Sequence, residues 1–69
     1  MKLSARNMVR GTVKRITPGS VNSEVVIEIA GGVEIVSSIT KQSVERLGLA
    51  PGKPAYAVIK ATSVMIAVD

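Results

Sequence analysis

The stretch Ser23–Ile39, SEVVIEIAGGVEIVSSI, decides how this chain folds. Its first half alternates apolar and polar residues, which is typical of a β-strand with one buried and one solvated face. The side chains predicted to point inward are those of Val25, Ile27 and Ile29. Gly31 and Gly32 then supply the positive φ angles that a tight turn needs. Residues 33–39 resume a strand pattern, so the stretch predicts a β-hairpin.

A further strand is predicted before this hairpin. In MVRGTVKRI, residues 8–16, the side chains of Val9, Gly11 and Val13 are expected on one face, and charged or polar side chains on the other. The sequence TPGS, residues 17–20, is typical of a turn. The strand therefore leads directly into the hairpin.

The segment after the hairpin changes period. In TKQSVERLGL, residues 40–49, apolar side chains fall three apart, which predicts one short helix. Thr40 is expected to cap its first turn, and Gly48 to end it in the left-handed conformation. Two more strands are predicted at residues 55–60, AYAVIK, and 64–68, VMIAV.

The element order indicates an all-β fold with one short helix. A helix between the third and fourth of five strands is the order of the OB-fold, a five-stranded Greek-key barrel. The chain has 69 residues, so we expect a single domain over residues 1–69. A domain of this size buries only about 60% of its unfolded surface, and open strand edges favour self-association, so we expect an oligomer.

The composition limits the chemistry. The chain contains no cysteine and no histidine, which removes thiolate and imidazole catalysis and the usual ligands of a bare metal cation. Its acidic residues are scattered, so we do not expect an enzyme. The net charge of +4 favours anionic partners. No membrane-spanning run or signal peptide is recognisable, which predicts a cytoplasmic protein.

A set of hydrogen-bond donors without a carboxylate predicts an oxyanion site. Hydroxyls and backbone N–H groups at the predicted helix start form a favourable seat for an anion. An arginine and a lysine converging there would add charge-assisted hydrogen bonds. The absence of a carboxylate favours a fully deprotonated dianion over an anion that carries a proton, and this discrimination is partial because hydroxyls can also accept a hydrogen bond. The predicted donors are Ser4, Arg6, Thr40, Ser43 and Lys60.

Each donor also has a simpler interpretation. Thr40 can be only a helix cap, Lys60 only a charge at a strand end, and Ser4 and Arg6 part of a flexible terminus. The basic residues near the N-terminus leave open a small nucleic-acid-binding module of the OB type, or a regulatory interaction module. With Tyr56 as its one aromatic residue, the chain has no platform for stacking bases, so nucleic acid is not the expected partner.

Four segments of the sequence resemble the molbindin, or Mop, family of small molybdate-binding proteins, whose domain also forms the effector module of molybdate-sensing regulators. The segments are SARN from Ser4, EVVIEIAGG ending at Gly32, ITKQSVERLGL from Ile39, and VIKATSVMIAV from Val58. They follow one another with family-like spacing along the whole chain. The resemblance implies an OB-like barrel in a homohexamer built as a trimer of dimers.

The resemblance also implies a function and a set of ligands. The function is storage and buffering of molybdate and tungstate at subunit interfaces, without catalysis or an organic cofactor, in a protein that binds no membrane. N-terminal donors are expected to complete a site on a neighbouring protomer. The implied ligands are Ser4, Arg6, Thr40, Ser43, Lys60 and the backbone N–H of Ala61.

A second kind of site, on a threefold axis, is also implied by the resemblance. We expect it to use main-chain groups of Gly19, Ser20, Val21 and Asn22. Two positions depart from the family pattern: Met8 stands where glutamine is common, and Ala61 where several members have serine. The second departure removes a hydroxyl donor, so it is expected to affect affinity more than binding itself.

Overall fold

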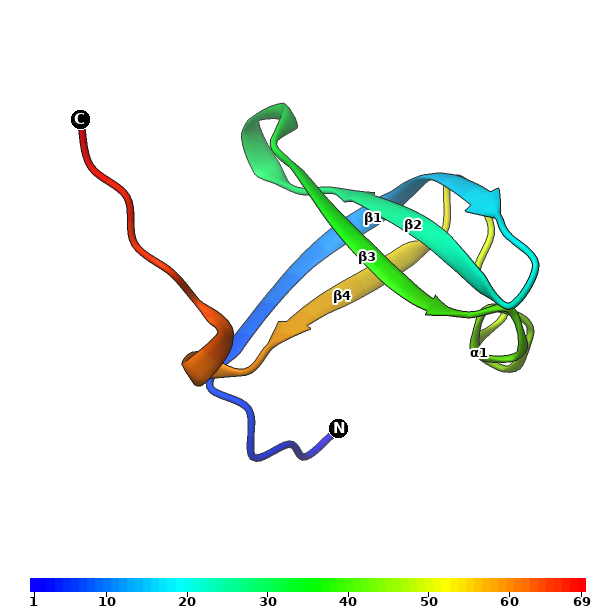
Figure 1. Cartoon of the computed structure of the whole chain (residues 1–69), viewed down its shortest axis with the longest axis horizontal. Coiled ribbons are helices and arrows are strands. Elements are labelled where there is room, and N and C mark those ends of the chain that lie inside the picture. Colours follow the sequence, from blue (N-terminus) through cyan, green and yellow to red (C-terminus); the bar gives the residue numbers. More distant parts are fainter.

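The computed structural model describes residues 1–69 and contains one curled antiparallel sheet (Figure 1). Its strands lie in the order β3-β2-β1-β4. This is the Greek-key arrangement, in which the fourth strand returns to lie beside the first. The strands are β1 (Asn7–Pro18), β2 (Asn22–Glu28), β3 (Glu34–Thr40) and β4 (Pro54–Ile59).

The predicted hairpin is confirmed. β2 and β3 pair along their whole length, from Asn22 opposite Thr40 to Glu28 opposite Glu34. The turn between them contains the 3-10 helix η1 (Ala30–Gly32), with φ angles of 82° at Gly31 and 78° at Gly32. A side chain at either position would be strained in this left-handed conformation.

β1 carries a β-bulge that the alternation did not predict. Val13 lies opposite Ile27 and Arg15 lies opposite Val26, so that Lys14 is an extra residue in the strand. A bulge disturbs the alternation and sharpens the twist of the strand. As a result Lys14 and Arg15 are both exposed, whereas Val13 before them is fully buried.

The hydrophobic core is small and lies on the concave face of the sheet. Val13, Val25, Ile27 and Ala57 form its buried cluster. Gly11 is required because β2 passes close by: a Cβ at this position would lie 2.6 Å from the carbonyl oxygen of Glu28 and 2.6 Å from the side chain of Ile27.

The short helix α1 (Lys41–Leu47) forms as the sequence predicts. The hydroxyl of Thr40 accepts a hydrogen bond of 3.1 Å from the backbone N–H of Ser43, which makes Thr40 the N-cap. Gly48 ends the helix with φ of 64°. The structure has no helix of the length and apolar character needed to cross a bilayer.

The prediction of a fifth strand at residues 64–68 is wrong for the single chain, which has four strands. After the 3-10 helix η2 (Ala61–Ser63), the C-terminal segment runs away from the sheet (Figure 1). A strand needs a neighbour for its backbone hydrogen bonds, and this segment has none within its own chain. β3 and β4 remain as the two edges, and the barrel is open.

Candidate functional site

A polar pocket lies where the β1–β4 ladder ends. The last paired residues are Asn7 and Ile59, and beyond them the two chain segments separate. The gap forms a pocket of about 310 Å³. Three consecutive residues line it from each side: Ser4, Ala5 and Arg6 from the N-terminal segment, and Lys60, Ala61 and Thr62 from the segment after β4.

The pocket is suited to an anion. Arg6 and Lys60 bring two cationic groups to it, and no carboxylate lines it. In η2, the backbone N–H groups of Ser63 and Val64 donate to Lys60 and Ala61. The N–H groups of Ala61 and Thr62 donate to no group of the chain and stay available to a ligand. Charge-assisted hydrogen bonds from such donors are about twice as strong as neutral ones.

Thr40 and Ser43 lie at the opposite end of the sheet, where α1 begins (Figure 1). Besides the capping bond, the Thr40 hydroxyl donates a hydrogen bond of 2.8 Å to the hydroxyl of Ser43. Neither residue lines the polar pocket. The predicted ligands therefore form two groups in one chain: Ser4, Arg6, Lys60 and Ala61 in the pocket, and Thr40 with Ser43 at the helix start.

The residues predicted for a second site lie beside the helix start. Gly19, Ser20 and Val21 form the turn between β1 and β2, and Asn22 is the strand partner of Thr40. The carbonyl oxygen of Val21 accepts a hydrogen bond of 3.0 Å from the backbone N–H of Lys41. This turn and the start of α1 therefore form one surface at that end of the molecule.

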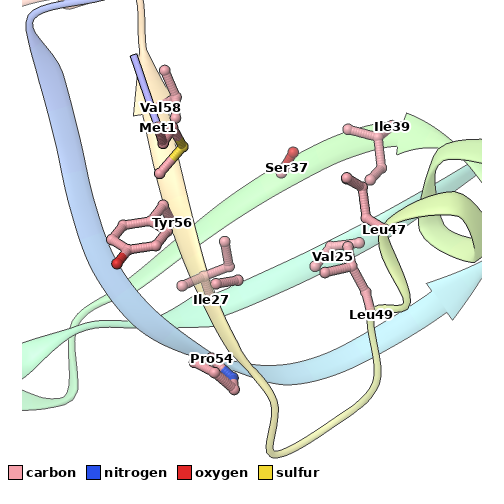
Figure 2. Close-up of a pocket in the computed structure, with 11 residues that line it drawn as sticks. Met1, Val25, Ile27, Ser37, Ile39, Leu47, Leu49, Pro54, Tyr56 and Val58 are labelled. Carbon is pink, nitrogen blue, oxygen red and sulfur yellow. The ribbon is translucent and has the colours of Figure 1, made fainter. Parts of the chain in front are cut away.

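A second, apolar hollow of about 330 Å³ opens on the concave face of the sheet (Figure 2). Met1, Tyr56 and Val58 line one end, and Ile39, Leu47 and Leu49 line the other. No charged side chain lines this hollow. An oxyanion buried there would lose its hydration without gaining partners, so the hollow is not the anion site.

A charged cluster covers part of the convex face. The ammonium of Lys14 bonds to Glu34 at 2.5 Å and to Glu28 at 3.4 Å, and Arg15 lies 3.6 Å from Glu34. The bond to Glu34, reinforced by that to Glu28, raises the pKa of Lys14 above its ordinary value. The same bond from Lys14 lowers the pKa of the Glu34 carboxyl. Because these acids neutralise Lys14 and Arg15, the cluster does not resemble a phosphate-binding stripe.

Thr62 lines the polar pocket but is not among the ligands predicted from the sequence. The pairing of β1 with β4 brings Thr62 to the pocket. These two strands are far apart in the sequence, so local sequence patterns do not reveal this pairing. The structure contains no group of three or more histidine, cysteine or acidic side chains that could hold a metal ion.

Comparison with known families gives a match to the TOBE domain over residues 3–66. The chain is also 51% identical, over the full length of both sequences, to the probable molybdenum-pterin-binding protein of Haemophilus influenzae.

Solved structures agree with this match. MopII from Clostridium pasteurianum superimposes with a TM-score of 0.91 at 48% identity, over 97% of this chain and 100% of its own. The cytoplasmic molybdate-binding protein ModG, solved with molybdate bound, gives a TM-score of 0.85 at 56% identity. That match covers 88% of this chain and 43% of ModG.

Proposed function

The chain belongs to the TOBE domain family and to the group of molybdenum-pterin-binding proteins, and we propose that it binds and stores molybdate and tungstate. The anion is bound and released by mass action as its free concentration changes. No catalytic step and no organic cofactor take part in this function. The description of the related ModG as cytoplasmic supports the same location for this protein.

One observation carries this proposal: the pocket at the end of the β1–β4 ladder joins Arg6 and Lys60 without a carboxylate. The hydroxyl of Ser4 and the free N–H of Ala61 add uncharged donors. Molybdate and tungstate are tetrahedral dianions that carry no proton near neutral pH, so they need donors only. Hydrogen phosphate carries a proton that needs an acceptor, and this pocket offers few.

The two groups of ligands support a site that lies between chains. Ser4 and Arg6 lie beside Lys60 of the same chain, whereas Thr40 and Ser43 are at the other end of the sheet. We therefore assign Thr40 and Ser43 of a neighbouring protomer to the polar pocket. Each anion would then neutralise positive charge between two subunits and stabilise their contact.

The open barrel supports the same assembly. β3 and β4 are the edge strands of the sheet, and each has one side without a strand partner. A hollow of about 170 Å³ lies between them. The segment from Val64 to Val68 has the pattern of a strand but leads away from its own sheet. Its apolar side chains are highly exposed, with Ile66 at 85% and Met65 at 91%. We propose that it forms the fifth strand in a second copy and closes that copy's barrel.

The contact between two copies through the C-terminal segment can be part of a larger assembly. We propose a homohexamer built as a trimer of dimers, since closed symmetric assemblies are the common form of soluble oligomers. The turn from Gly19 to Asn22 is assigned to a second kind of anion site, on the threefold axis. Its residues are exposed and lie next to the start of α1, which supports a role at the same interfaces.

Calorimetry on the purified protein tests the function. Molybdate and tungstate are titrated against sulfate and phosphate at equal concentration and ionic strength. We expect saturable binding of the first two and at least tenfold weaker binding of phosphate, whose proton needs an acceptor. Sulfate carries no proton, and at least tenfold weaker sulfate binding is what a store selective for molybdate and tungstate requires. Equal affinity for all four anions, or no binding of molybdate, would refute oxyanion storage. Native mass spectrometry of the same samples tests the hexamer, and a monomer in every condition would refute it.

A further inference from the structure

The polar pocket is lined by the residues that follow the end of the β1–β4 ladder on each segment. In the β1–β4 ladder Met8 pairs with Val58 and Asn7 with Ile59. Counted from this last pair, Arg6 and Lys60 come first on the two segments, Ala5 and Ala61 second, and Ser4 and Thr62 third, although the segments are no longer paired and Ala61–Ser63 forms η2. These are the six residues that line the pocket.

Each of these three pairs of residues has its own chemistry. The Arg6 and Lys60 position, nearest the ladder, supplies positive charge. The Ala5 and Ala61 position has the smallest side chains that carry a Cβ, which leaves room between the two segments. The Ser4 and Thr62 position supplies a hydroxyl from each segment. The lining of the pocket therefore includes two cationic residues and two residues with hydroxyl groups.

We infer that Thr62 is a further ligand of the bound oxyanion and acts through its side-chain hydroxyl. The inference rests on the proposed function, because it places a donor in the same pocket. Ala61, its neighbour, has no hydroxyl, so Thr62 is the one hydroxyl donor that the segment after β4 brings to this pocket. Ser63 follows directly and is exposed, but does not line the pocket.

The test compares three variants of the full chain by calorimetry with molybdate. Thr62→Val keeps the shape of the side chain and removes the hydroxyl, whereas Thr62→Ser keeps the hydroxyl and removes the methyl group. Ser63→Ala removes a neighbouring hydroxyl as the matched control. We expect Thr62→Val to weaken binding about 10- to 100-fold, as the loss of a hydrogen bond to a charged group does. Thr62→Ser and Ser63→Ala should stay within about threefold of the wild type.

The outcomes separate this inference from the function itself. If the wild type binds molybdate and Thr62→Val binds it equally well, Thr62 is not a ligand, although the storage function stands. If Thr62→Ser is as weak as Thr62→Val, a retained hydroxyl does not retain the affinity, and the proposed role of the hydroxyl is refuted. If the wild type binds no molybdate, the function fails and the role of Thr62 fails with it. Native mass spectrometry without anion should show the same assembly for all variants, which excludes loss of the interface as the cause.

Discussion

Asn7 and Ile59 face each other as the last pair of the β1–β4 ladder, and Arg6 and Lys60 directly follow them at the same end of the sheet. Two cationic side chains that line one pocket repel each other when the pocket is empty. A bound dianion attracts both cations, and this attraction offsets their mutual repulsion. With the anion bound here as proposed, the affinity for the anion is coupled to the stability of the protein.

This coupling predicts that molybdate raises the melting temperature. A ligand at about 100 times its dissociation constant stabilises the folded state by about 2.7 kcal/mol per site. In a domain of this size that corresponds to a rise on the order of 10 °C. Differential scanning calorimetry at rising molybdate concentration measures it. A melting temperature independent of molybdate would contradict the prediction.

Lys60→Ala should weaken molybdate binding by about tenfold or more, because it removes a charged donor from the pocket. Lys53→Ala is the matched control, since it removes the same charge from an exposed lysine outside the pocket and without an ion pair. Calorimetric titration at constant ionic strength distinguishes the two. Equal effects would mean that only net charge matters and that Lys60 is not a ligand.

Variants of Thr40 and Ser43 distinguish an effect on molybdate binding from an effect on the stability of α1. Thr40→Ala removes the N-cap and should lower the free energy of unfolding by about 1 kcal/mol. Ser43→Ala leaves the cap oxygen and its backbone donor in place. We expect Ser43→Ala to weaken molybdate binding with little change in the urea midpoint. Unchanged affinity in Ser43→Ala would exclude its hydroxyl from the site.

Gly11→Ala should destabilise the fold by about 1–3 kcal/mol, because the added methyl group would overlap the backbone of β2. Thr12→Val is the control, since Thr12 is the next residue in the strand and is exposed. Chemical denaturation followed by circular dichroism measures both. If both variants unfold at the wild-type midpoint, the close approach of the two strands is not a constraint.

The Lys14–Glu34 pair predicts a small dependence of stability on pH. Glu34 has a lowered pKa in the folded state, so its contribution is present above its ordinary value of 4.5 and is lost as the pH falls through the lower folded value. Lys14 has a raised pKa, so its contribution is present below 10.5 and is lost as the pH rises past the folded value. Both groups are exposed, and the effect is therefore modest.

Urea unfolding at pH 7 and pH 3 checks the acid side of this dependence. Glu34→Gln should lose less stability between these two pH values than the wild type. Glu45→Gln is the control, because Glu45 is exposed and takes part in no ion pair. Identical acid sensitivity in Glu34→Gln and the wild type would show that the pair contributes nothing.

Much of the fold can be predicted from sequence because its signals are local. Alternation, the glycine pair at Gly31 and the capping residues of α1 each act over a few positions, and the structure confirms them. The bulge at Lys14 was missed because it depends on how β1 pairs with β2, a relation between separate segments. Strict alternation from Val13 would point Arg15 inward, whereas the structure exposes Arg15 and half-buries Ile16. The strand expected at residues 64–68 has a correct local pattern but no partner within the chain.

The candidate site was only partly predictable for the same reason. The amino-acid types of Ser4, Arg6 and Lys60 point to an anion, and the structure brings these residues together. Sequence spacing gave no indication that Thr40 and Ser43 lie at the other end of the sheet. It also gave no indication of Thr62, whose place depends on how β4 aligns with β1.

The open end of the β1–β4 ladder has a consequence for how such a protein can evolve. If Ala5 and Ala61 continued the antiparallel pairing, the chain would gain backbone hydrogen bonds and the pocket would close. Strand pairing and the proposed anion binding would thus compete for the same six residues. Substitutions that extend the pairing at this end would raise the stability of the protein and lower the amount of anion that it binds.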